Sequence, residues 1–200
     1  MDFNIRKSPD AVFLEMRILI PLIFLVTFSA CKQKEPQPKF ISAVSLIKQE
    51  VKHIDTSLYS IKRYTTIDTF PTDTSFITRE RFRSEVADFL QVPDLSDPRQ
   101  ATLYGEASQF DTLINRAIIA YTAKDPNKQP YRTIELFVEP NLATGDQVRT
   151  IWIVRLQSDR TGSEELKMTW QVGKSCSRTR ITRKPGGQEE VHTTKWSWNE

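Results

Sequence analysis

Apolar residues recur at helical spacing in the segment that begins at residue 40. They follow one another in steps of three and four residues: Phe40, Val44, Ile47, Val51, Ile54, Leu58 and Ile61. This is the period of one helix face, and it predicts an amphipathic helix over residues 41–55. Its extension to residue 63 stays open, because Asp55 and Ser57 are residue types that end helices. The spacing also matches a coiled-coil seam, but about three heptads are few, so we favour a helix that packs on a sheet.

A second helix is predicted after a loop over residues 65–75, which is rich in threonine and aspartate. Thr78 is a suitable N-cap, and Glu80 places a negative charge in the first turn, where the helix dipole favours it. The apolar face consists of Phe82, Val86, Phe89 and Leu90. The helix is expected to end before Pro93, because the residue preceding a proline is disfavoured in helical conformation.

From Ala101 onward the apolar residues alternate with polar ones, which is typical of β-strands. Seven segments are rich in β-branched and aromatic residues and are bounded by turn residues: 101–108, 113–122, 131–138, 147–157, 164–172, 176–183 and 189–198. The segment 165–172 alternates cleanly, so one face of the sheet is expected to lie in water. Residues 151–153 are apolar on both faces, which indicates a central strand.

These elements predict an α+β fold in which two N-terminal helices precede an antiparallel meander of about seven strands. A sheet of this size twists and curls, so we expect a curved sheet with the helix 40–61 packed across its concave face. The arrangement resembles envelope lipid carriers and cystatin-like folds in architecture only. Residues 40–200 are expected to form a single domain.

The chain before this domain contains an apolar run of 11 residues, Ile18–Phe28. A helix of that length rises about 17 Å, roughly half of what a bilayer core requires, so a signal peptide fits better than a membrane span. The run ends in Phe28-Ser-Ala-Cys31, which resembles the lipobox of bacterial lipoproteins, although that family usually has leucine where Phe28 stands. The resemblance implies a signal peptide over residues 1–30, cleavage before Cys31 and diacylglycerol on the Cys31 sulfur.

The residues around this signal add two expectations. Residues 1–15 carry three acidic side chains, whereas a leader that begins at Met16 would be short with one positive charge, so we predict that translation starts at Met16. Residues 31–39 are polar and contain prolines, which indicates a tether. The residue after the cysteine is Lys32 and not an aspartate. By resemblance to lipoprotein sorting, this implies delivery to the outer membrane. The acyl chains would hold the protein there, on the periplasmic side or at the cell surface.

Charge and cysteine content narrow the functional classes. The net charge of +3 is too small to indicate nucleic acid as a partner. Residues 32–63 are mainly basic, and residues 64–113 are mainly acidic. The basic segment could favour an anionic membrane surface, or the charges could simply lie on solvated faces. Cys176 is the only cysteine after Cys31, so no intrachain disulfide is expected, and we predict that Cys176 is a buried core residue.

Catalytic and metal motifs are not found in the sequence. It contains no HExxH, CxxC, GxSxG or Gly-rich phosphate loop. His192 and Cys176 could form a base and nucleophile pair, but a structural role for the histidine is favoured, and His53 is expected to be exposed. Four aspartates lie in loops where calcium would find oxygen ligands, but such residues usually cap backbone amides: Asp68, Asp73, Asp94 and Asp97. We expect no catalytic residue, no metal and no cofactor.

Two groups of residues remain as binding candidates. Arg178, Arg180 and Arg183 concentrate positive charge in the sixth predicted strand, together with the neighbouring lysines 174 and 184. They indicate either an anionic partner or a charged edge strand paired with Glu189 and Glu190. Trp196 and Trp198 share one face at the C-terminus, where aromatic residues line interfaces or close the end of a core.

The sequence therefore predicts a lipid-anchored envelope protein that is not an enzyme and that binds a small molecule, a lipid or a protein partner. Beyond its lipobox, the chain resembles small uncharacterised envelope lipoproteins. A scaffold or accessory subunit of an outer-membrane assembly is the alternative, and a hydrolase of unrecognised type is the third.

Overall fold

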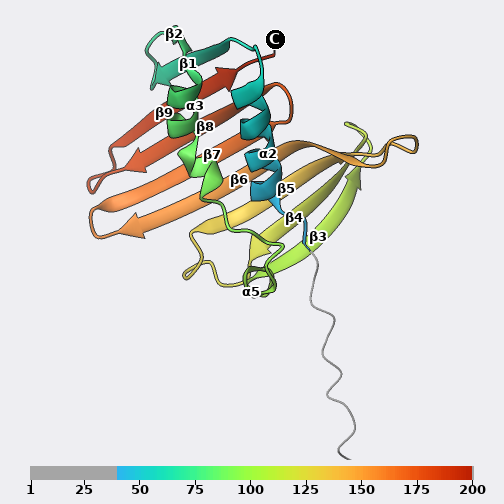
Figure 1. Cartoon of the computed structure of the whole chain (residues 1–200). Helices are drawn as coiled ribbons and strands as arrows, with labels where there is room; N and C mark the ends of the chain where they lie inside the picture. Colours follow the sequence, from blue (N-terminus) through green and yellow to red (C-terminus); the bar gives the residue numbers. More distant parts are fainter. Residues whose placement is uncertain (1–39, 200) are drawn as a thin grey trace, which may run out of the picture. The chain divides into compact units, whose positions relative to one another are not determined.

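The computed structural model describes residues 40–199, which belong to one compact unit (Figure 1). The predictions on Cys31, the signal peptide, the start at Met16 and the tether lie outside the described residues. Within residues 40–199, no helix combines the length and the apolar character that crossing a bilayer requires.

The first helix, α2 (Ala43–Thr56), is the amphipathic helix that the sequence predicts. Ser42 caps it, because its side-chain oxygen accepts a hydrogen bond from the Ser45 N–H. The apolar stripe is buried: Ala43, Val44, Ile47, Val51 and Ile54. The extension to residue 63, which the sequence left open, does not form: the helix ends at Thr56, the Ser57 hydroxyl donates to the Ile54 carbonyl, and a strand begins at Ile61.

Two strands follow where a loop was expected. β1 (Ile61–Ile67) and β2 (Asp73–Ile77) form an antiparallel hairpin. Most of their side chains are exposed or half-buried, so they lack the apolar alternation that reveals a strand in a sequence. The predicted loop at residues 65–75 is therefore reduced to the turn between them.

The second predicted helix is broken into two pieces, α3 (Arg79–Glu85) and α4 (Ala87–Leu90). Thr78 caps α3 as expected, because its hydroxyl accepts a hydrogen bond from the Arg81 N–H. The break lies at Val86, which leaves the helical region with φ −93° and ψ 12°. The kink keeps Phe82, Val86 and Phe89 fully buried on one side. A short helix, α5 (Pro98–Ala101), leads into the rest of the sheet.

The remaining chain is the predicted meander. Its strands are β3 (Tyr104–Asp111), β4 (Arg116–Ala123), β5 (Tyr131–Glu139), β6 (Gln147–Asp159), β7 (Gly162–Gln171), β8 (Ser175–Arg183) and β9 (Glu189–Ser197). With the first hairpin they make one antiparallel sheet of nine strands, in the order β2-β1-β9-β8-β7-β6-β5-β4-β3. The α+β class and the antiparallel meander are confirmed, whereas the expected two helices and total of about seven strands are wrong, because β1 and β2 join the sheet and the described helical residues form four helices. The middle strand is β7, and β6, which holds residues 151–153, lies beside it.

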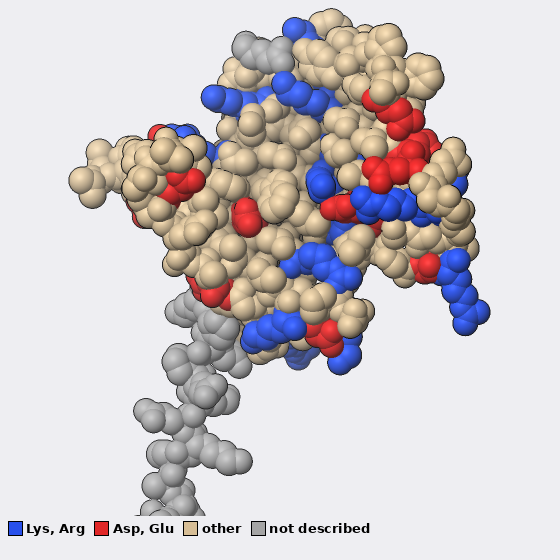
Figure 2. Space-filling model, turned by 180° about the vertical axis from the view of Figure 1, so that it is seen from behind, with Lys and Arg blue, Asp and Glu red and all other residues tan. Residues whose placement is uncertain are grey.

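Helices α2, α3 and α4 lie across the same face of this sheet (Figure 1). Between helices and sheet, an aromatic cluster fills the interior: Phe82, Phe89, Trp170 and Trp198, with ring centroids 5.3–6.5 Å apart. The space under the helices is therefore occupied by side chains. The helices lie in front of the sheet in Figure 1, and Figure 2 shows the molecule from behind.

Candidate functional site

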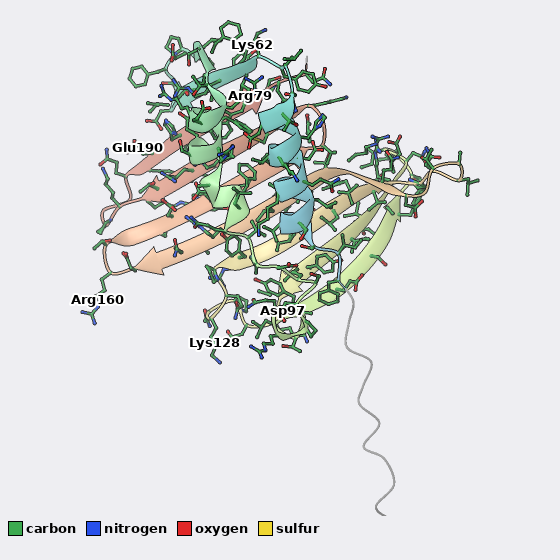
Figure 3. All side chains as sticks on the ribbon, in the orientation of Figure 1. Lys62, Arg79, Asp97, Lys128, Arg160 and Glu190 are labelled. Atoms are coloured by element: carbon green, nitrogen blue, oxygen red, sulfur yellow. The ribbon has the colours of Figure 1, made fainter. Side chains whose placement is uncertain are left out.

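A polar pocket of about 900 Å³ opens at one end of the strands. Its walls are the loop between β4 and β5, the β6–β7 hairpin and the end of β8. Polar side chains dominate its lining, among them Gln129, Arg132, Gln157, Ser158, Glu164 and Thr182. Figure 3 labels Lys128 on the loop and Arg160 on the turn of the hairpin, and the pocket lies between these two segments.

The pocket forms because β6 extends beyond the end of its neighbour β5. The ladder between them begins with Tyr131 opposite Arg155, and the Leu156 N–H donates to the Pro130 carbonyl at 2.8 Å. Beyond that bond β6 continues with β7 alone, to the pair Asp159–Gly162. The N–H and C=O groups of successive residues in a strand point to opposite sides. Those of Ser158 therefore point to the side of β6 on which β5 no longer lies.

Gly162 closes the β6–β7 turn and is required there. Its φ is 145°, a conformation that residues with side chains avoid. A Cβ at this position would also lie 2.3 Å from the Arg183 carbonyl oxygen. The turn therefore brings β7 and β8 closely together at the pocket wall.

Arg132 lies at an irregularity in the pocket wall. The β5–β6 register shifts between Tyr131 and Thr133, so Arg132 occupies a bulge. Its Nε and Nη1 atoms are buried and have no hydrogen-bond partner among the described residues. A buried unpaired donor is costly, and bulges often orient a functional side chain.

A network of charges lies next to the pocket. Glu164, which lines it, receives a hydrogen bond from Arg155 at 2.8 Å and lies 3.3 Å from the Arg180 Nε. Asp88 of α4 lies 2.5 Å from Arg178, 3.6 Å from Arg180 and 3.9 Å from Arg155. Three arginines thus share two carboxylates, which leaves one net positive charge in this network.

The network continues through Arg155 to Tyr131. Burial lowers the pKa of Arg155, but its bonds to Glu164 and Tyr131 outweigh this effect, so the pKa is raised and the guanidinium stays charged. Burial raises the pKa of the Tyr131 hydroxyl, against the opposing effect of Arg155. Tyr131 is therefore a neutral hydrogen-bonding group next to a fixed cation.

Glu85 joins the helices to the far part of the sheet. It accepts hydrogen bonds from Arg63 at 3.0 Å, from Arg81 at 2.9 Å and from the Trp196 indole at 2.8 Å. Burial raises the pKa of this carboxyl, but the bonds from Trp196, Arg81 and Arg63 together outweigh it, so the pKa is lowered. Glu85 is thus ionised at neutral pH and holds α3 on the sheet.

The structure separates the three arginines that the sequence singled out. Arg178 is half-buried, donates to Asp88 and to the Glu85 carbonyl, and lies 5.4 Å from the centre of the Trp196 ring. Arg180 faces the charge network. Arg183 lines the pocket and is paired with Glu189 at 2.8 Å, the partner that the edge-strand interpretation named, and β8 is an inner strand.

The two C-terminal tryptophans lie in the core. Trp196 is fully buried and Trp198 nearly so. Trp198 packs edge-on against Phe82 with a centroid distance of 5.6 Å. Neither ring lines the pocket, so neither can contact a ligand there.

The other candidates do not form a reactive site. Cys176 is buried, and burial raises the pKa of its thiol well above the usual value. In the β8–β9 register it lies opposite Trp196, while His192 lies opposite Arg180, four residues further along β8 or about 13 Å. The base and nucleophile pair is therefore excluded by the strand register. His53 is exposed on α2, as the sequence indicated.

The loop aspartates hold the backbone in most cases. Asp68 accepts a hydrogen bond from the Val191 N–H, Asp94 from the Ser96 N–H and Asp97 from the Arg99 N–H. Asp73 begins β2. Within residues 40–199, no group of three His, Cys, Asp or Glu side chains is arranged to hold a metal ion.

Sequence reasoning missed Asp88, Arg132, Arg155 and Glu164. The alternation of β6 contained a signal, because Arg155 follows Ile151 and Ile153 on the face that the helices cover. A charge at such a position indicates a buried partner. The partner itself, on α4, could not be found from the sequence because it is 67 residues away (155 − 88).

Comparison with known proteins gives no relative. No family model matches the chain, and neither a curated protein nor a solved structure is significantly similar to it.

Proposed function

We propose that this chain is a lipid-anchored envelope protein whose folded domain binds a polar, negatively charged small molecule in the pocket at the end of β6–β8. The observation that supports this proposal is the pocket lining. Hydroxyl and amide groups surround a volume of about 900 Å³, and three cations, Lys128, Arg132 and Arg183, outnumber Asp159 and Glu164. Small-molecule pockets commonly have volumes of about 300–1,000 Å³.

Arg132 is the side chain we assign to the anionic group of the ligand. Lys128 and Arg183 already have carboxylate partners, Asp125 at 3.1 Å and Glu189 at 2.8 Å. Arg132 has two buried nitrogens without a partner. A guanidinium binds carboxylate or phosphate through two parallel hydrogen bonds, so a small rotation toward the pocket would satisfy it.

Binding fits the site better than catalysis does. The pocket contains carboxylates, but Glu164 is engaged by Arg155 and Arg180, and the pocket lining includes neither histidine nor cysteine. A general base needs a free lone pair within hydrogen-bond reach of its substrate. We therefore propose a binding protein without enzymatic activity.

The anchor part of the proposal rests on the lipobox-like sequence before Cys31. Labelling cells with a radioactive fatty acid should mark the protein, and Cys31→Ser should abolish the label. An unlabelled wild-type protein would refute the anchor and leave the pocket untouched. The first peptide of the precursor, trapped by blocking the signal peptidase, should begin at Met16.

The pocket is tested by native mass spectrometry of residues 32–200 after mild purification. We expect a discrete extra mass on the wild type that is lost in Arg132→Gln. Arg160→Gln is the matched control, because it removes the same charge from the neighbouring turn, outside the pocket lining. If a bound mass survives Arg132→Gln, the assignment of this residue is wrong. If the wild type is bare and also fails to bind added phosphate or glucuronate, the pocket is not a ligand site.

The scaffold function remains a second candidate because of one strand. β3 forms an edge of the sheet over eight residues, and it has no lysine, proline or bulge to hinder strand addition. An extended segment of a partner could pair with it. Crosslinking the lipidated protein in its own membrane should then capture one defined partner through β3.

A further inference from the structure

Two neighbouring hairpins carry large apolar side chains into solvent. Leu113 in the β3–β4 turn and Leu142 in the β5–β6 turn are fully exposed, and Phe110 and Ile114 are about half exposed. Both turns lie at the same end of the sheet, because β4 and β5 pair directly from Ala117 opposite Val138. Figure 2 shows this end of the sheet as a projection on the left. We call these four residues the apolar tips.

The turns hold these side chains outward through their polar residues. The Asp111 carboxylate accepts a hydrogen bond from the Leu113 N–H at 2.9 Å. The Asn141 side chain accepts bonds from Ala143 and Thr144, and Asp146 accepts one from the Asn141 N–H. The polar groups thus serve the backbone. The side chains of Leu113 and Leu142 are left in solvent.

An ion-pair triad lies at the base of the tips. Arg116 of β4 and Arg149 of β6 both bind one oxygen of Glu139, Arg116 at 3.0 Å. Two cations share one carboxylate, but Asp111 and Asp146 of the same turns bring the net charge of this end of the sheet to −1. The triad ties the strands of both hairpins together immediately behind the apolar residues.

We infer that the apolar tips insert into a lipid surface. The four side chains stand on two separate convex turns, a shape that suits a deformable medium. A protein partner would need a continuous patch of roughly 800 Å² on this side. A lipid-anchored protein gains firm attachment from a second membrane contact. This inference does not depend on the pocket.

The chain length is compatible with an anchor at Cys31. Phe40 stacks on Tyr121, which lies five residues along β4 from Arg116, or about 17 Å. The nine residues from Cys31 to Phe40 span at most about 30 Å. The pocket lies at the opposite end of the strands, so contact at the tips would turn its opening away from the membrane.

The test is flotation of residues 32–200 with vesicles of phosphatidylethanolamine and phosphatidylglycerol in a three-to-one ratio. The Leu113→Ser/Leu142→Ser variant should partition at least roughly 100-fold more weakly than the wild type, from the transfer free energy of two leucines. Leu58→Ser/Phe76→Ser is the control, because it removes two exposed apolar groups at the opposite edge of the sheet, and it should bind like the wild type. Because all four residues are exposed, none of these changes should alter the fold.

Three results would overturn the inference. A wild type that fails to float at millimolar lipid concentration would show that the tips do not insert. Equal loss in both variants would show unspecific adhesion. Sedimentation velocity without vesicles tests for self-association. If the wild type self-associates and the tip variant does not, the tips bind a second copy of this chain.

Discussion

Glu85→Gln tests whether the helices are held on the sheet by one carboxylate. The change keeps the size of the side chain and removes its charge. Glu85 accepts three hydrogen bonds, two of them from arginines, and its side chain is 21% exposed. The glutamine oxygen can accept only some of these three hydrogen bonds. Its NH₂ group, itself a donor, would face the donors that remain.

The magnitude follows from these contacts. Hydrogen bonds to charged groups contribute about 1.5–3 kcal/mol each, and solvent at the exposed Arg81 weakens one of them. We therefore expect the free energy of unfolding to fall by about 2–4 kcal/mol, a large part of the roughly 5–15 kcal/mol typical of a domain. Urea unfolding followed by circular dichroism measures it. Glu106→Gln, an exposed carboxylate on β3, is the control for net charge.

The pH dependence gives this prediction a sign. The folded-state pKa of Glu85 is lowered, so its stabilising contribution is present above its usual value of 4.5 and is lost as the pH falls through the folded pKa. The variant and the wild type should converge in acid, where both side chains are neutral. A variant within about 0.5 kcal/mol of the wild type at neutral pH would refute the role we assign to Glu85.

Three further experiments probe other parts of the domain. Burial raises the pKa of Glu135, so the charge of this carboxylate opposes folding at neutral pH. Glu135→Gln should therefore raise the melting temperature at neutral pH and give no gain below pH 4.5. A lower melting temperature of the variant at neutral pH would contradict the burial argument. Cys176 should react with a thiol reagent only as fast as the domain unfolds, because it is buried with a raised pKa; fast labelling of the native protein would show an open core. Phe82→Ala should cost about 3–5 kcal/mol in urea unfolding, whereas Phe70→Ala on the surface should cost almost nothing.

The sequence predicts those elements that bury one face. The meander was found because its strands alternate, as in β7, where Leu166, Met168 and Trp170 are all buried and Lys167 is exposed. β1 and β2 were missed for the same physical reason. A hairpin at the edge of a sheet packs few side chains, so Asp73–Ile77 needs no apolar pattern to pair with its neighbour.

The candidate site was only partly predictable because its partners come from distant segments. The basic residues of β8 were visible as a cluster, but their functional meaning depends on Asp88 and Glu164, which only the fold brings to them. The pocket depends on strand lengths. β6 extends past β5 by a few residues, and no local pattern in either strand records that difference.

On the face of the sheet under the helices, charged residues replace apolar ones toward the end that holds the pocket. On the face under the helices, β6 passes from Ile151 and Ile153 to Arg155, and β7 passes from Leu166 to Glu164. On β8 the same face passes from Cys176 to Arg178. Helix α4 faces these charged positions with Asp88, which pairs with Arg178, Arg180 and Arg155. Charged residues interrupt the buried positions of three adjacent strands at staggered levels, within four residues of one another along the strands, and they mark where the packed core ends and a binding surface can begin. Replacing Arg155 with leucine would extend the core pattern by one layer, and we expect it to weaken ligand binding, through the loss of the partner of Glu164, more than it weakens folding.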